Sequence, residues 1–351
     1  VPCFQRGILS HSSAPSVQSS GAESKGNWSV KNFKLLLLAA LMSVASLPAM
    51  AQLNNTYVIA AAGNQRGAFG AHWMTRFSIF NPHLDDTLFV TVIFLPTGGV
   101  PGPDPMLIEL PPNAMAYSDN LLEDLFGLEG SGSLLVATFP EDNPSLPDDD
   151  VLASSFLVTS DTYNNTGNGT YGQTIPGVWS GLLDYDSDGI SSVSPIVRNK
   201  GIWRTNVGAV NLGATGVTLL VNVYDGDGNT VLHQAPLLIP PYSHNQAPLP
   251  VEIEVGSVEF FVQDPLANDP DRYAVVFPYT STIDRRTGDP TYATPTLLAE
   301  PGILFAKGQK IDPTTLGKKI DVSYARNVRK QSKHIGTARL LHDDNGFKIA
   351  R

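Results

Sequence analysis

The chain has 351 residues, of which 42% are hydrophobic and only 16% charged, and its formal net charge is −10. This apolar content suffices for two cores of ordinary domain size, and the acidic balance excludes nucleic acid as the expected partner because phosphates would be repelled. The 31 glycines and 27 prolines favour short strands joined by turns over long helices. Composition therefore predicts an all-β protein.

The first 30 residues are rich in serine and poor in apolar side chains, and we expect no function from them. Val1 and Val30 could both arise from a start codon other than Met, so Val30 is the expected true start. The single cysteine, Cys3, lies in this segment. Disulfides, thiolate nucleophiles and thiolate metal ligands are therefore excluded from the rest of the chain.

Residues 31–51 have the three parts of a signal peptide. Lys31 and Lys34 precede an apolar run, 35–47, which ends at Ala49-Met50-Ala51. The run is shorter than the roughly 20 residues that span a bilayer. We expect cleavage after Ala51, no transmembrane segment after cleavage, and a mature protein that is secreted, periplasmic or at the cell surface.

A strand-like segment occurs twice, about 130 residues apart. Trp73-Met74-Thr75-Arg76-Phe77 leads to Asn81, and Trp203-Arg204-Thr205-Asn206-Val207 leads to Asn211. Later landmarks recur in the same order: Leu110-Pro111-Pro112 as Ile239-Pro240-Pro241, Gly132-Ser133-Leu134 as Gly256-Ser257-Val258, and the Thr-Gly-x-x-Thr-Tyr segments at Thr166 and Thr287. Preserved order indicates a duplicated unit, so matched positions are expected to serve the fold.

Apolar residues alternate with period two at Leu219, Val221 and Val223, which predicts a half-buried strand. The following segment, 225–229, contains Gly and Asx residues and predicts a hairpin turn. One short helix is expected at 120–126, with Asp119 as its N-terminal cap and Gly127 as its stop. Further strands are predicted at 75–80, 88–95, 107–110, 133–139, 152–159, 258–263 and 273–279.

These elements predict two tandem antiparallel immunoglobulin-like β-sandwich domains, with the short helix in the first. The expected domains span 52–180 and 201–299, and a linker with an acidic loop occupies 181–200. Trp73 and Trp203 are expected in the two cores. Flexible N- and C-terminal extensions complete the chain, and the latter is a basic tail, 300–351, with 5 acidic and 11 basic residues. The tail is predicted to be poorly ordered, or else to dock on an anionic surface or on the acidic body.

The paired Trp-Arg-Thr-Asn strand and Thr-Gly-Asp-Pro-Thr segment resemble those of uncharacterised exported bacterial proteins with tandem β-sandwiches. The resemblance covers Tyr57 to Leu298, and the first copy departs from it at Met74, at Arg76 and at Asn168-Gly169. It implies architecture and export, and it carries no activity or functional residue over to this chain.

The segment Asp184-Tyr185-Asp186-Ser187-Asp188-Gly189 repeats the first half of a Ca²⁺-binding loop, in which alternating carboxylates converge on one hard cation. Asp184, Asp186 and Asp188 are therefore candidate Ca²⁺ ligands. Pro195 stands where the bidentate acid is expected, so an acidic turn without metal is the alternative reading. No other cofactor is expected.

The sequence lacks the Gly-x-Ser-x-Gly and His-Glu-x-x-His motifs of common hydrolases. It therefore favours a non-catalytic surface, matrix or adhesion-type module that binds a glycan or a protein. The alternatives are a secreted hydrolase that uses loop carboxylates and a Ca²⁺-stiffened spacer. Because binding surfaces are expected to differ between the copies, the loops 96–105 and 141–150 of the first copy are candidate binding loops.

Overall fold

The computed structural model describes residues 54–67, 70–146, 153–166, 169–178, 183–184, 191–228, 230–263, 275–298, 322–344 and 346–351. Strands dominate these residues and the helices among them are short, which confirms the all-β prediction. Residues 1–30 and the predicted signal segment, 31–51, lie outside the described residues, so export remains a prediction.

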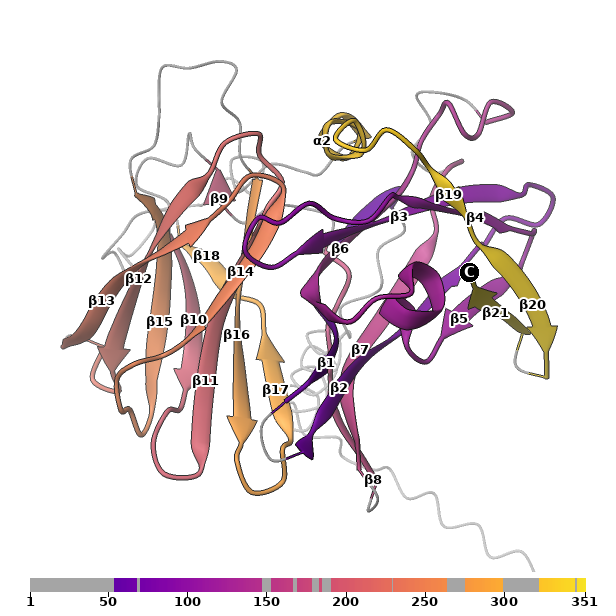
Figure 1. The fold of residues 1–351 in the computed structure, drawn as a ribbon. Helices are drawn as coiled ribbons and strands as arrows, with labels where there is room; N and C mark the ends of the chain where they lie inside the picture. Colours follow the sequence, from indigo (N-terminus) through magenta and orange to yellow (C-terminus); the bar gives the residue numbers. More distant parts are fainter. Residues whose placement is uncertain are drawn as a thin grey trace, which may run out of the picture. The chain divides into compact units, whose positions relative to one another are not determined.

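The first strand set consists of eight strands that pair in two groups (Figure 1). One group has the order β4-β3-β6-β1 and the other has the order β5-β2-β7-β8. Strand β1 pairs with β6 and also, near its end, with β2, so it links the two groups. The bounds are β1 (Thr56–Arg66), β2 (His72–Phe80), β3 (Leu88–Pro96), β4 (Met106–Leu110), β5 (Met115–Ser118), β6 (Gly130–Thr138), β7 (Leu157–Thr166) and β8 (Gly169–Thr174).

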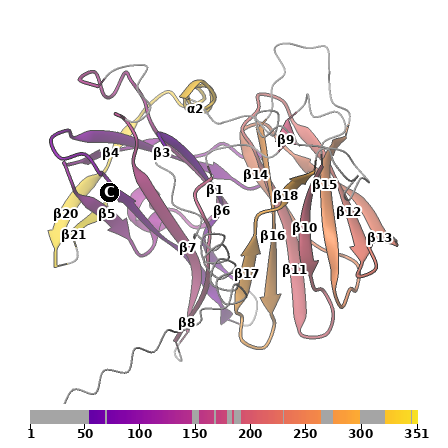
Figure 2. The same ribbon diagram turned by 180° about the vertical axis from the view of Figure 1, so that it is seen from behind.

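The second strand set repeats this pairing order (Figure 2). Its groups are β13-β12-β15-β10, extended by β18, and β14-β11-β16-β17, to which β9 adds beside β16. The landmarks that recur in the sequence therefore lie on corresponding strands, such as β2 and β11. The bounds are β9 (Leu183–Asp184), β10 (Ser191–Val197), β11 (Trp203–Asn211), β12 (Val217–Asp225), β13 (Val231–Ile239), β14 (Ser243–Pro248), β15 (Gly256–Gln263), β16 (Val275–Asp284), β17 (Pro290–Ala293) and β18 (Thr296–Leu298).

The pairing order differs from that of an immunoglobulin domain at two strands. Immunoglobulin domains place the first strand beside the second and the seventh beside the sixth. Here β1 lies beside β6 and β7 lies beside β2, and β10 and β16 take the same places in the second set. The central pairs β2–β5 and β3–β6 do match the immunoglobulin pairs B–E and C–F.

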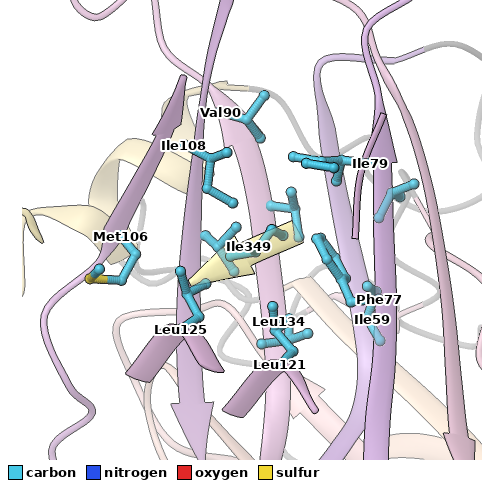
Figure 3. Close-up of a cluster of buried hydrophobic side chains, with 14 of the residues drawn as sticks. Ile59, Phe77, Ile79, Val90, Met106, Ile108, Leu121, Leu125, Leu134 and Ile349 are labelled. Carbon is cyan, nitrogen blue, oxygen red and sulfur yellow. The ribbon is translucent and has the colours of Figure 1, made fainter. Parts of the chain in front are cut away.

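Each strand set encloses a core of its own. In the first core Ile59, Phe77 and Leu134 point toward one another from three strands (Figure 3). In the second core Leu219, Val221 and Val223 of β12 are buried on one face, as the period-two pattern predicts. Strand β12 then turns into β13 at the expected hairpin, where Gly228 has a φ of 72°.

The recurring Asn and Pro-Pro landmarks have a common hydrogen-bonding role. The Asn81 side-chain amide donates to the carbonyls of Leu110 and Pro111, and its carbonyl accepts from the backbone two residues later. The Asn211 amide donates to the carbonyls of Ile239 and Pro240, and its carbonyl accepts from Gly213. Both asparagines are fully buried, so each satisfies backbone groups that water cannot reach.

The predicted helix starts two residues later than expected, ends where expected, and lacks the predicted N-terminal cap. Helix η2 (Leu122–Phe126) is a single π-helical turn, and it ends at Gly127 in the left-handed conformation, as expected. Asp119 is not its cap, because its carboxylate pairs with Arg76. The N-cap position is occupied by Leu121, with no side-chain cap; upstream, the Ser118 hydroxyl accepts from the Asn120 backbone N–H and donates to Asp124.

The prediction of a poorly ordered tail is wrong for residues 322–351. Helix α2 (Val322–Arg329) buries Ala325 and Val328, while its Arg326 and Arg329 pair with Glu141 and Asp142. Docking on the acidic body, the alternative reading, thus describes this helix. Residues 299–321 lie outside the described part of the chain.

Three strands follow α2, namely β19 (Gly336–Thr337), β20 (Arg339–Asp343) and β21 (Gly346–Ala350). Strand β19 pairs with β4, and β21 pairs with β5. Ile349 of β21 is fully buried in the first core, where it is drawn in Figure 3. The composition of the tail did not predict these strands, because the tail contains few apolar residues.

Replacing Asn211 with Ala should lower the free energy of unfolding by about 2–4 kcal/mol, because several buried backbone groups lose their partner. Urea denaturation followed by tryptophan fluorescence measures this change. Asn165→Ala, at an exposed site on β7, is the control and should stay within about 0.5 kcal/mol of the wild type. Equal effects of the two substitutions would contradict the role assigned to Asn211.

Candidate functional site

A third apolar cluster joins the two strand sets. Ile93, Leu95 and Leu135 lie on the outer face of β3 and β6, and they pack with Val210 of β11 and Phe277 of β16. Ala325 and Val328 of α2 join the same cluster. Both strand sets belong to one compact unit, Ala51–Arg351, and the predicted domain bounds and linker stay predictions.

The face of β11 that meets the first strand set changes from apolar to polar along its length. Val210 and Leu212 belong to the apolar cluster, whereas Arg204 and Asn206 lie at the other end of the same face. Between them is Gly208, where a β-carbon would overlap the ring of Tyr279 on β16. The missing side chain therefore lets the Tyr279 ring approach the β11 backbone closely.

His244 of β14 is the polar centre of this junction. Its Nδ1 lies 2.7 Å from the Thr97 hydroxyl, and its Nε2 lies 2.8 Å from the Tyr279 hydroxyl. The backbone N–H of Gly98 donates to the His244 carbonyl. Burial lowers the pKa of His244 to about 3, so the imidazole is neutral at physiological pH.

Beside His244 the two strand sets line an open cavity of about 280 Å³, which we call the junction cavity. This volume is near the lower end of the roughly 300–1,000 Å³ that is typical of small-molecule sites. The described residues lining it include no Asp or Glu. The side chains that define its chemistry are those of Trp73, Arg204, Gln65, Gln173, Asn206, Gln246, Ser131, Thr162 and Ser281.

Arg204 is the cation of the junction cavity. Its Nε is buried and has no hydrogen-bond partner among the described residues. Burial, and then the nearby charge of Arg285, lower the pKa of the guanidinium. Several other described arginines have a carboxylate partner, such as Arg76 with Asp119 and Arg326 with Glu141, whereas no described carboxylate pairs with Arg204.

The two recurring tryptophans are not the core aromatics that the sequence predicted. Trp73 and Trp203 are both only partly buried, and neither belongs to a core cluster. Trp73 lines the junction cavity, and a β-carbon at Gly67 would overlap its indole. Trp203 lies instead beneath the guanidinium of Arg198, 5.5 Å from the ring centre.

The candidate Ca²⁺ ligands are not brought together by any described contact. Asp184 lies in β9, where its backbone pairs with Val275, but Asp186 and Asp188 lie outside the described residues. Within the described ranges, no group of three or more His, Cys, Asp or Glu side chains could hold a metal ion. The Ca²⁺ site therefore stays a prediction.

The two candidate binding loops contact other parts of the chain. In the first, the Gly99 backbone N–H donates to the Ser243 hydroxyl, which donates to the Pro96 carbonyl. In the second, Glu141 and Asp142 hold α2, and residues 147–150 lie outside the described residues. The described parts of both loops thus fasten the fold.

The helices that the structure describes are too short or too polar to cross a membrane. Comparison of the chain with models of protein families, with curated proteins and with solved structures found no match. The chemistry of the junction cavity is therefore the evidence on which a function can be argued.

The sequence contained an indication of this cavity, but the search for binding residues considered only the loops that differ between the copies. In the repeated strand, Arg204 and Asn206 stand where the first copy has Met74 and Arg76. The expectation that function lies where the copies differ applies to these strand positions as well as to loops.

His244 should make folding stability depend on pH. Below about pH 6.5 the unfolded chain binds a proton at this side chain, whereas the folded chain does so only near pH 3. Its contribution to stability is therefore complete above about pH 6.5 and falls by up to about 1.4 kcal/mol per pH unit on acidification.

Urea denaturation of the wild type and of His244→Gln between pH 4 and pH 7 measures this slope. We expect a shallower dependence in His244→Gln, while His334→Gln, at an exposed site, should keep the slope of the wild type. An unchanged slope in His244→Gln would mean that the folded protein already accepts the proton.

Proposed function

We propose that this protein is a non-catalytic, exported binding module whose ligand site is the junction cavity. The ligand that suits this cavity best is a glycan. The proposal combines the predicted signal segment, 31–51, with the chemistry of the side chains that line the cavity.

The observation that carries the proposal is the pairing of one aromatic ring with several amides and hydroxyls. An indole such as that of Trp73 offers an apolar face to the C–H groups of a sugar ring, while Gln, Asn and Ser side chains match its hydroxyls. These groups come from both strand sets, so ligand binding depends on their association.

The same cavity argues against hydrolysis. A hydrolase needs a general acid or base, or an activated nucleophile, within hydrogen-bond reach of its substrate. The described lining residues provide no carboxylate, and both ring nitrogens of His244 already have partners. A pKa of about 3 also makes His244 a poor proton carrier near neutral pH.

In architecture, we infer two tandem β-sandwiches that differ from immunoglobulin domains in the places of their first and seventh strands. The recurring pairing orders and the separate cores of the two sets support this inference. The apolar cluster between the sets would then hold the sandwiches at a fixed angle, which keeps the cavity preformed.

A glycan array probed with the full chain tests the proposal. We expect selective binding to a subset of glycans, with no cleavage of those glycans or of ester and peptide substrates. Trp73→Ala should weaken binding by about tenfold or more, because it removes the aromatic wall of the cavity.

Trp203→Ala is the matched control, since it removes the corresponding tryptophan of the other strand set and leaves the cavity lining unchanged. An array without binding, or equal losses in both variants, would contradict the proposed site. Turnover that a single Asp substitution abolishes would instead favour the secreted hydrolase.

A further inference from the structure

We propose that the junction cavity takes a hexuronic acid unit and that Arg204 binds its carboxylate. This inference rests on the proposed glycan-binding function and adds the charge class of the sugar.

The first argument is the unmet hydrogen-bonding capacity of Arg204. A guanidinium carries five N–H donors, and desolvating it without a partner is costly. The described residues give its buried Nε no acceptor, and no described carboxylate pairs with it. A bound carboxylate would supply two parallel hydrogen bonds and the missing negative charge.

The second argument is the electrostatic surroundings. Arg285, whose charge acts on Arg204, adds a second cation near the cavity. The chain as a whole has a net charge of −10, so a cationic spot without a carboxylate in its lining contrasts with the rest of the molecule. Such a spot attracts an anionic group and disfavours a neutral one.

The third argument is that the polar lining is rich in donors. The Gln173 side-chain carbonyl accepts from Ser281, and that of Gln246 accepts from Tyr279. No acceptor is found for the amide NH₂ groups of these glutamines among the described residues, so they are available as donors to a ligand. Donors need acceptors, and the carboxylate and hydroxyl oxygens of a uronic acid provide them.

A carboxylate fits better than a doubly charged phosphate. Arg204 is the single Lys or Arg among the described lining residues, so the cavity offers one full positive charge. Phosphate sites generally combine several cations or backbone N–H groups. The Trp73 ring is also better matched to a sugar ring than to a bare anion.

The experiment is calorimetric titration of the full chain with galacturonic acid, with galactose, and with galactose 6-sulfate. The first two sugars differ only in whether carbon 6 is a carboxylate or an alcohol. We expect galacturonic acid to bind about tenfold or more tightly than galactose, as is typical of hydrogen bonds to a charged group. Galactose 6-sulfate should bind more weakly than galacturonic acid.

Arg204→Gln should lower the affinity for galacturonic acid by about tenfold and leave that for galactose within about twofold. Arg285→Gln is the matched control for a nearby charge that does not line the cavity, and it should change either affinity by less than about threefold. The melting temperature of Arg204→Gln should not fall, because the substitution removes an unpaired charge.

Equal affinity for galacturonic acid and galactose, or no effect of Arg204→Gln, would overturn the uronic acid assignment. The glycan-binding function would still stand if Trp73→Ala weakened galactose binding. A preference for the sulfated sugar would refute the choice of carboxylate, and a marked drop in the melting temperature of Arg204→Gln would show that the guanidinium has a structural partner. An empty glycan array would remove the proposed function together with this inference.

Discussion

Phe277 and Val210 of the second strand set pack against Leu135 of the first, and this apolar contact excludes water from two sheet faces at once. Both walls of the junction cavity belong to strands that the contact holds together. The buried hydrogen bonds of His244 make this contact directional, because the ring bonds to Thr97 of the first strand set and to Tyr279 of the second. If these contacts keep the cavity preformed, a ligand would lose little free energy in ordering its site.

Local sequence patterns located some strands, such as β3 and β12, but they placed β7 too early, at 152–159, and did not predict how the strands associate. Alternating apolar residues located β12, and the Gly and Asx residues located the hairpin that follows it. The prediction for the tryptophans was wrong because a large aromatic side chain suits a core, a cavity wall and the surface beneath an arginine equally well, so sequence alone does not distinguish these places. Residues 322–351 were misjudged because a net positive charge hides the few apolar positions, such as Ile349, that anchor them. The junction cavity itself depends on contacts between distant segments, which periodicity does not encode.

Duplication explains why so many polar residues recur without marking a site. Asn81 and Asn211 bind equivalent carbonyls in the two strand sets, so their recurrence reflects the shared strand order. Positions released from that requirement could diverge. Arg204, which replaces Met74, lies on the face of β11 that the second copy turns toward the first. The junction cavity therefore lies where the two similar strand sets meet, at positions where their sequences differ.

Strand β21 has a consequence for the order in which the molecule acquires its structure. Ile349 fills the core that Ile59, Phe77 and Leu134 begin, so the earliest strands wait for a segment more than 200 positions later. That segment follows both strand sets in the chain, and contacts of such long range slow the search for the native state. Until β21 has packed, the first core lacks the side chain of Ile349, and chaperones that recognise exposed apolar surface would find that surface there.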